Sequence, residues 1–225
     1  MRKVNNRVLY LSGMSDHEEF MEEERWKKGP IVFIGGILLA LLFVLSIVPA
    51  YNVKVDSNPT STPERVDVFF GRNNQTVFSL ESYSQIEDYV VTDGSIKQSA
   101  DTISVFGCGN DRVCQAKAQY LFVRDKIIYT NDPLRHEFVK TPGYTLDVGA
   151  GDCDDHAVLL SSLLNSIGIE TRFIFVPSHV YIQAYLPESL NKYQDDDGWV
   201  NLDATCKSCD FGDLAQTYEI SYIVD

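Results

Sequence analysis

Histidine is scarce in this chain, with four among 225 residues, and basic residues are outnumbered by acidic ones. Nineteen Lys and Arg face 32 Asp and Glu, so the formal net charge is −13. Such a deficit of positive charge argues against nucleic acid or an anionic lipid surface as a partner. Repeats and low-complexity tracts are also absent, and a hydrophobic content of 44% argues against disorder of the whole chain.

Charge is missing altogether from one segment, Ile31 to Val48. As a helix, these 18 residues would span roughly 27 Å, close to the hydrocarbon thickness of a bilayer. Pro30 and Pro49 bracket the segment and suit a helix start and a chain exit. A buried core helix and a cleaved signal peptide are the alternatives. Because about thirty residues precede the segment, we expect an uncleaved signal anchor over residues 31–49.

The flanking charges predict an orientation for this anchor. Arg25, Lys27 and Lys28 lie just before it, and only Lys54 lies close behind it, so the N-terminus is expected in the cytoplasm. The resulting division is a cytoplasmic tail 1–30, the anchor 31–49, a Ser-, Thr- and Pro-containing linker 50–64, and an extracytoplasmic domain 65–225. The expected location is the cell membrane, with a single pass. Asn74 opens a glycosylation sequon on the predicted outer side.

The periodicity of the domain predicts an α+β fold. Helical spacing over residues 111–129 is followed by a loop at 141–151 and by a helix at 152–167 that is apolar on most sides. Strands are expected at 171–176, 180–186 and 199–204. This order indicates a central helix packed on an antiparallel sheet.

Cys153 lies at the first turn of the predicted central helix. The preceding glycines allow a tight turn, and Asp152 is a suitable N-cap. The positive end of a helix dipole lowers the pKa of a thiol, and its N–H groups can hold an oxyanion. Three neighbouring aspartates act in the opposite direction, since nearby negative charge raises a thiol pKa. A buried cysteine at a helix start is also commonly a small apolar residue with no chemical role.

A thiol nucleophile needs a base, and the base needs an orienting group. His17 lies in the tail, His136 lies in a polar loop, and His156 lies one turn further along the same helix. His179 opens a strand directly after a turn, and Asp203 lies in the next predicted strand. Each residue also has an ordinary structural interpretation.

The motifs Gly151-Asp152-Cys153-Asp154-Asp155-His156-Ala157, His179-Val180-Tyr181 and Trp199-Val200-Asn201-Leu202-Asp203 together resemble the core of the transglutaminase-like superfamily. Residues 122–129 and 163–172 are also similar to segments of that core. The resemblance covers roughly residues 111–203. It implies a papain-like α+β core in which Cys153 is the nucleophile, His179 the base and acid, and Asp203 the orienting residue. The oxyanion donor of the family is not matched.

The remaining four cysteines form an even set, Cys108, Cys114, Cys206 and Cys209. In an exterior compartment such a set favours two disulfides, whose pairing the sequence leaves open. A structural zinc site held by four thiolates is the main alternative, because the last two cysteines form a CxxC motif. Free thiols are the third.

The favoured function is a cysteine-dependent acyl-transfer enzyme, of protease, amidase or transglutaminase type, acting through a thioester on a protein or peptide. Such a mechanism needs no cofactor. A non-catalytic binding or scaffold module on the same fold is the alternative, although an intact Cys, His and Asp set speaks against it. A metal site built from Asp154, His156 and either His179 or Asp203 is a third hypothesis, which would leave Cys153 unexplained.

Overall fold

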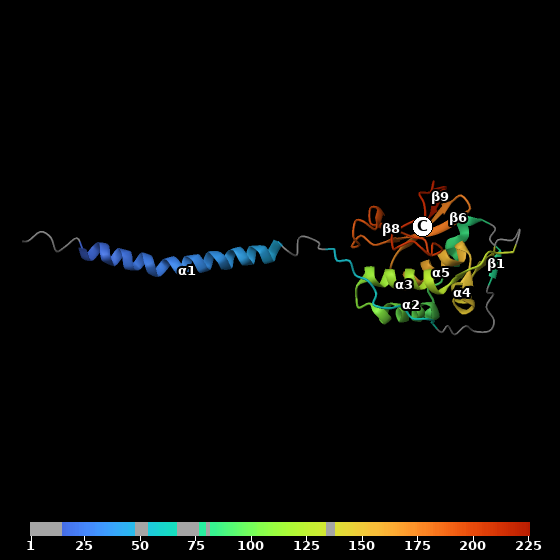
Figure 1. The fold of residues 1–225 in the computed structure, drawn as a ribbon, viewed down its shortest axis with the longest axis horizontal. Helices are drawn as coiled ribbons and strands as arrows, with labels where there is room; N and C mark the ends of the chain where they lie inside the picture. The colour runs from blue at the N-terminus through green and yellow to red at the C-terminus, as the bar shows by residue number, and fades with distance from the viewer. Residues whose placement is uncertain (1–14, 48–53, 67–76, 80–81, 134–137) are drawn as a thin grey trace, which may run out of the picture. The chain divides into compact units, whose positions relative to one another are not determined.

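The computed structural model describes residues 15–47, 54–66, 77–79, 82–133 and 138–225, and the Asn74 sequon lies outside them. The chain divides into two compact units, residues 1–53 and 54–225. Figure 1 shows the long helix of the first unit and the mixed helices and strands of the second.

The first unit contains a single described helix, α1 (Ser15–Ile47). Residues Gly29–Ser46 have a mean hydropathy of 2.5, and none of them is buried by the rest of the described structure. This part of the helix is long and apolar enough to cross a membrane. The sequence predicted a helix start at Pro30. The helix instead begins at Ser15 and continues through Pro30. Residues 31–47 of the segment predicted as a helix are therefore helical, and the helix extends further toward the N-terminus.

Two helices of the second unit pack against each other, α2 (Gly94–Gly107) and α3 (Arg112–Lys126). Each has an aspartate N-cap, because Asp93 accepts from the N–H groups of Ser95 and Ile96 at 3.0 Å and Asp111 accepts from Cys114 at 2.8 Å. These bonds satisfy donors that a helix start leaves unpaired. The predicted helix at 111–129 is confirmed except at its end, where residues 128 and 129 form β2 (Ile128–Tyr129).

The segment 141–151 was expected to be a loop, and this was wrong for most of its length. It contains α4 (Pro142–Val148), in which proline occupies the first turn and Thr141 caps the N–H of Tyr144 at 3.3 Å. Proline is favoured at a helix start because its missing N–H has no partner there anyway. The last two residues form β4 (Ala150–Gly151), which pairs with β2 in parallel.

The central helix is confirmed as α5 (Cys153–Ser166), with Asp152 at its N-cap position. It ends at Ser166, and Gly168, two residues later, has a φ of +77° that suits a residue without a side chain. Shorter elements complete the domain: β1 (Val77–Ser79), the 3-10 helix η2 (Tyr83–Tyr89) and β3 (Phe138–Lys140), of which β1 and β3 pair.

An antiparallel sheet of five strands carries the second half of the domain. Its strands are β5 (Thr171–Val176), β6 (His179–Tyr185), β7 (Gln194–Asp196), β8 (Trp199–Leu202) and β9 (Tyr222–Val224). The order across the sheet is β7-β8-β6-β5-β9. The three strands predicted from the sequence are all present, and β7 and β9 are additions.

Figure 1 shows α5 lying between α2 and α3 on one side and the sheet on the other. The alternation along β5 separates two apolar clusters. Phe173 and Phe175 belong to the main core with α5, whereas Ile174 and Val176 belong to a smaller cluster on the opposite face. The predicted α+β architecture, a central helix on an antiparallel sheet, is thus the observed one.

Part of the expected linker lies on the domain. Asp56 accepts hydrogen bonds from the buried ammonium of Lys117, from Lys192 at 3.0 Å and from the hydroxyl of Tyr193 at 2.9 Å. The Lys117 bond, followed by that from Lys192, lowers the pKa of Asp56 far below its usual value. Residues from Lys54 onward therefore belong to the second unit.

Candidate active site

Cys153 is the first residue of α5, and two features of the chain hold it there. The parallel pair β2–β4 fixes the backbone just before it, with Thr130 donating to the carbonyl of Gly151 at 2.8 Å. The N–H of Asp152 then donates to Oδ2 of Asp155 at 3.2 Å, which is one half of a capping box. The thiol is therefore presented at a helix N-terminus, as the sequence predicted.

The thiol itself is half-buried and is the one free cysteine of the chain. Burial, followed by the charges of Asp154 and Asp152, raises its pKa to about 12. The N–H groups of Val180 and Asp154 donate to the sulfur and offset only part of this rise. At neutral pH the resting group is a thiol, so a base is required to ionise it.

The hydrogen bond from Val180 locates the sulfur beside the start of β6, because Val180 follows His179 directly. Nε2 of His179 lies 3.0 Å from Oδ2 of Asp203, whose side chain is 2% exposed. Burial raises the pKa of Asp203, but the hydrogen bonds from His179 and Thr205 outweigh it and hold the pKa below its usual value. The three residues singled out in the sequence thus come from a helix start, a strand start and the end of a neighbouring strand.

The geometry of the pair assigns roles to the two ring nitrogens of His179. Asp203 is ionised at neutral pH, so Nε2 of His179 carries the proton and donates to it. The other nitrogen, Nδ1, is then the one that can accept a proton. Thr205 donates through its N–H and hydroxyl to Oδ1 of Asp203, at 3.1 and 2.6 Å, and so holds the carboxylate in place.

Three aspartates surround the thiol in the sequence, but they do not share one role. Asp155 is fully buried and accepts from the N–H and the ammonium of Lys140. Burial, followed by a hydrogen bond with Asp152, raises the pKa of Asp154 to about 10, so this carboxyl is neutral at pH 7. Lys140 therefore offsets the charge of Asp155, and the raised pKa of Asp154 keeps that carboxyl protonated at pH 7. When ionised, Asp154 and Asp152 still raise the pKa of the thiol, as the sequence indicated.

The metal site considered for Asp154, His156 and His179 or Asp203 does not form. Burial lowers the pKa of His156, and its ring nitrogens lie 2.7 Å from the carbonyl oxygen of Asp152 and 3.4 Å from that of Ile127. Among described residues, the acidic groups near enough to share an ion are Asp132, Asp152 and Asp155. The ammonium of Lys140 already contacts two of these.

The four remaining cysteines pair locally, as Cys108–Cys114 and Cys206–Cys209. Disulfides are thus favoured over zinc, and the pairing that the sequence left open is the local one. The second disulfide follows Asp203 by three residues, where Tyr120 and Arg124 donate to the carbonyl of Cys209 at 3.1 and 2.7 Å. This disulfide and these two hydrogen bonds stabilise the turn that follows Asp203.

No role was predicted from the sequence for three tyrosines near the site. The rings of Tyr181 and Tyr218 lie 6.3 and 5.9 Å from the ring of His179. Tyr129, at the end of β2, is 43% exposed, and its pKa is raised by burial and by the charge of Cys153 when that residue is ionised. Tyr181 lies two residues beyond His179 on the same strand face, so strand periodicity could have identified it. Tyr218 lies far from His179 in the sequence, and no motif or periodicity around it indicates that it lies near the site.

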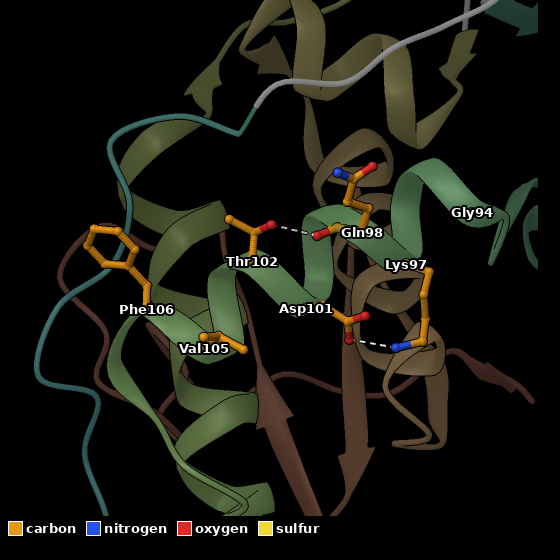
Figure 2. Close-up of a pocket in the computed structure, with 7 residues that line it drawn as sticks. All are labelled: Gly94, Lys97, Gln98, Asp101, Thr102, Val105 and Phe106. Carbon is orange, nitrogen blue, oxygen red and sulfur yellow. Dashed lines mark hydrogen bonds and ion pairs between the residues drawn. The ribbon is translucent and has the colours of Figure 1, made fainter.

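A pocket on the surface of the domain lies apart from these residues. Figure 2 shows that its lining comes from α2, between Gly94 and Phe106, with Lys97 and Asp101 paired across one turn. None of Cys153, His179 and Asp203 lines it. It is not the candidate active site.

Comparison with known proteins agrees with the resemblance noted in the sequence. Residues 97–204 match the family described as the transglutaminase-like superfamily, a span that contains Cys153, His179 and Asp203. One solved structure with some similarity, that of a proposed cysteine protease from Cytophaga hutchinsonii, has a TM-score of 0.39 and 16% identity, and the match covers 56% of this chain and 44% of that chain. No curated protein matches. The chain therefore carries a domain of the transglutaminase-like superfamily at residues 97–204.

Proposed function

We propose that the protein is a membrane-anchored cysteine enzyme that transfers acyl groups from amide bonds, with Cys153, His179 and Asp203 as its catalytic residues. The observation that carries this proposal is the meeting of two bonds at the start of β6. The N–H of Val180 donates to the Cys153 sulfur, and the preceding residue, His179, is held by Asp203 at 3.0 Å. A nucleophile, a base and an orienting group are the parts that such chemistry requires.

The reaction follows from the protonation states. Nδ1 of His179 accepts the thiol proton as the sulfur attacks the amide carbonyl, and buried Asp203 stabilises the imidazolium that forms. Unpaired N–H groups at the start of α5 favour the oxyanion. The imidazolium then protonates the leaving amine, and a thioester remains on Cys153. Attack by water gives an acid, and attack by an amine gives a new amide.

Alkylation of Cys153 tests the proposal without a known substrate. The full-length chain, purified in detergent, is treated with iodoacetamide at pH 7, and the modified peptide is followed by mass spectrometry. We expect His179→Ala to slow the modification about 10²-fold or more, because a thiol with a raised pKa loses its base. His17→Ala, which changes a histidine of the N-terminal segment, serves as the control and is expected to label like wild type.

Equal and slow labelling in all three proteins would favour the binding module. Asp203→Asn refines the test, because an amide cannot stabilise the imidazolium. We expect Asp203→Asn to slow the alkylation of Cys153 as well, by about 10–10³-fold. Peptide amides incubated with hydroxylamine then separate the two acceptors, since a hydroxamate forms only if a thioester is open to an amine.

The anchoring part of the proposal is supported by α1 and by the disulfides. The apolar half of α1 meets the length requirement for a membrane span, and disulfides persist mainly in oxidising compartments. We propose that α1 holds the domain at the outer face of the cell membrane, with the N-terminus inside. Protease added to intact cells should then remove the domain, whereas protection until lysis would place it inside.

A further inference from the structure

The C-terminal segment 211–221, here called the strap, lies outside residues 97–204 that match the family. It is fixed at both ends. Phe211 is 6% exposed and packs edge-on against Tyr120 and Tyr193, with ring centroids 6.0 and 5.4 Å apart. At the other end the N–H of Ser221 donates to the carbonyl of Phe175 at 2.7 Å, and β9 then joins the sheet beside β5.

The middle of the strap docks on the sheet face opposite α5. Leu214 and Tyr218 pack against the smaller apolar cluster formed by Ile174, Val176 and Tyr181. Alternation along β6 puts Tyr181 on the same face as His179, so the strap crosses the sheet beside the candidate active site. The strap itself has no regular helix or strand before β9 and depends on these contacts for its position.

Tyr218 is the strap residue that reaches the imidazole. Its ring centroid lies 5.9 Å from that of His179, at 39°, and 6.1 Å from that of Tyr181. Tyr181 lies 6.3 Å from His179, so the three rings contact one another in a closed set. Burial raises the pKa of Tyr218, and the carboxylate of Asp203 adds to this, so the phenol lies within electrostatic range of that carboxylate.

We propose that Tyr218 is a positioning residue, which covers the hydrogen bond between His179 and Asp203 and keeps water away from it. This inference rests on the proposed function, in which that bond orients the base. A hydrogen bond to a carboxylate is weakened when water competes for either partner and strengthened in a low-dielectric surrounding. The rings of Tyr218 and Tyr181 also limit rotation of the imidazole, so that the ring keeps the orientation set by its bond to Asp203.

The ring N–H of His179 reports this cover directly. The full-length chain in detergent is labelled with ¹⁵N-histidine, which gives only four residues to resolve, and His179→Ala identifies the signal. In wild type, we expect the Nε2 proton to be protected from exchange with water. Tyr218→Ala should accelerate its exchange about tenfold or more, while Tyr218→Phe should keep it near wild type, because the ring and not the hydroxyl forms the cover.

Two further variants guard against a general loss of structure. Tyr218→Val keeps an apolar side chain in the cluster but is too short to reach the imidazole, and it should behave like Tyr218→Ala. Tyr222→Ala removes a ring of the same type, which stacks on Phe175 at 4.5 Å, and should leave the exchange unchanged. An equal acceleration in Tyr222→Ala, or in Tyr218→Phe, would overturn the inference.

Cys153 alkylation measured on the same samples separates the two proposals. If wild-type labelling depends on His179 but Tyr218→Ala and Tyr218→Val leave both exchange and labelling unchanged, only the role of Tyr218 is overturned. If wild-type labelling does not depend on His179, the proposed function itself fails. Faster exchange of the Nε2 proton together with slower alkylation of Cys153 is the result that supports the proposed role of Tyr218.

Discussion

Gly151 and Asp155 lie so close together that position 151 has no room for a side chain. A Cβ atom at residue 151 would lie 2.5 Å from Cβ of Asp155 and 2.7 Å from its Oδ2. Asp155 cannot move aside easily, because it is fully buried and held by Lys140. The glycine therefore allows the chain to turn into α5 directly before the thiol.

We expect Gly151→Ala to displace the start of α5. The fold should lose about 1–3 kcal/mol of stability, the usual cost of overpacking. Cys153 alkylation should slow about tenfold or more, since a small misplacement is costly in catalysis. Gly94→Ala is the matched control, because a Cβ there meets nothing within 4 Å. Wild-type labelling in Gly151→Ala would show that the close contact does not position the thiol.

Asp154 offers a prediction about pH. Burial and the hydrogen bond with Asp152 raise its folded pKa to about 10, from an unfolded value near 3.8. The folded protein therefore keeps a proton that the unfolded chain has released, and stability falls as pH rises through that window. Asp154→Asn cannot titrate, so it should be more stable than wild type at pH 8, by on the order of 2 kcal/mol, with a shallower pH dependence.

Chemical unfolding at pH 5 and at pH 8 measures this difference. Asp101→Asn, at an exposed ion pair on α2, should change stability by less than about 0.5 kcal/mol at either pH. Alkylation of Cys153 at pH 7 should be nearly the same in Asp154→Asn as in wild type, since the replaced carboxyl is already neutral. Parallel pH profiles for the wild type and Asp154→Asn would contradict the assigned protonation.

The two disulfides are expected to differ in their effect on the site. Each closes a short loop, of six and three residues in sequence separation, so replacing either pair with serine should cost about 2 kcal/mol and lower Tm by about 4–8 °C. Only Cys206–Cys209 follows Asp203 closely. We expect its removal also to slow Cys153 alkylation, while removal of Cys108–Cys114 lowers Tm alone. Equal labelling in both double variants would mean that the turn after Asp203 is held by other contacts.

Much of the site could be predicted because its residues carry local signals. Glycines followed by an aspartate and a helix that is apolar on most sides mark the position of Cys153, and a turn followed by alternating residues marks that of His179. Asp203 could be inferred because neighbouring antiparallel strands bring their ends together. Each of these signals lies within a few residues of the side chain concerned.

The features that escaped prediction depend on contacts between distant segments. Nothing near Asp154 in the sequence reveals that its carboxyl is buried and protonated, because this results from packing around it. Tyr218 meets His179 across 39 residues, through a strap with no periodicity of its own. By contrast, α4 had a usable signal, a threonine cap followed by proline, that was outweighed by the glycines around it.

The strap has a consequence for biosynthesis. A ribosome releases the N-terminal part of a chain first, at roughly 5–20 residues per second. The 21 residues from 204 to 224 therefore emerge roughly 1–4 s after Asp203. During that interval α5, β6 and β8 can already assemble, while the last sheet strand and the tyrosine beside the imidazole are still missing. A newly made domain would thus pass through a stage in which its thiol and base are together but its C-terminal edge is open.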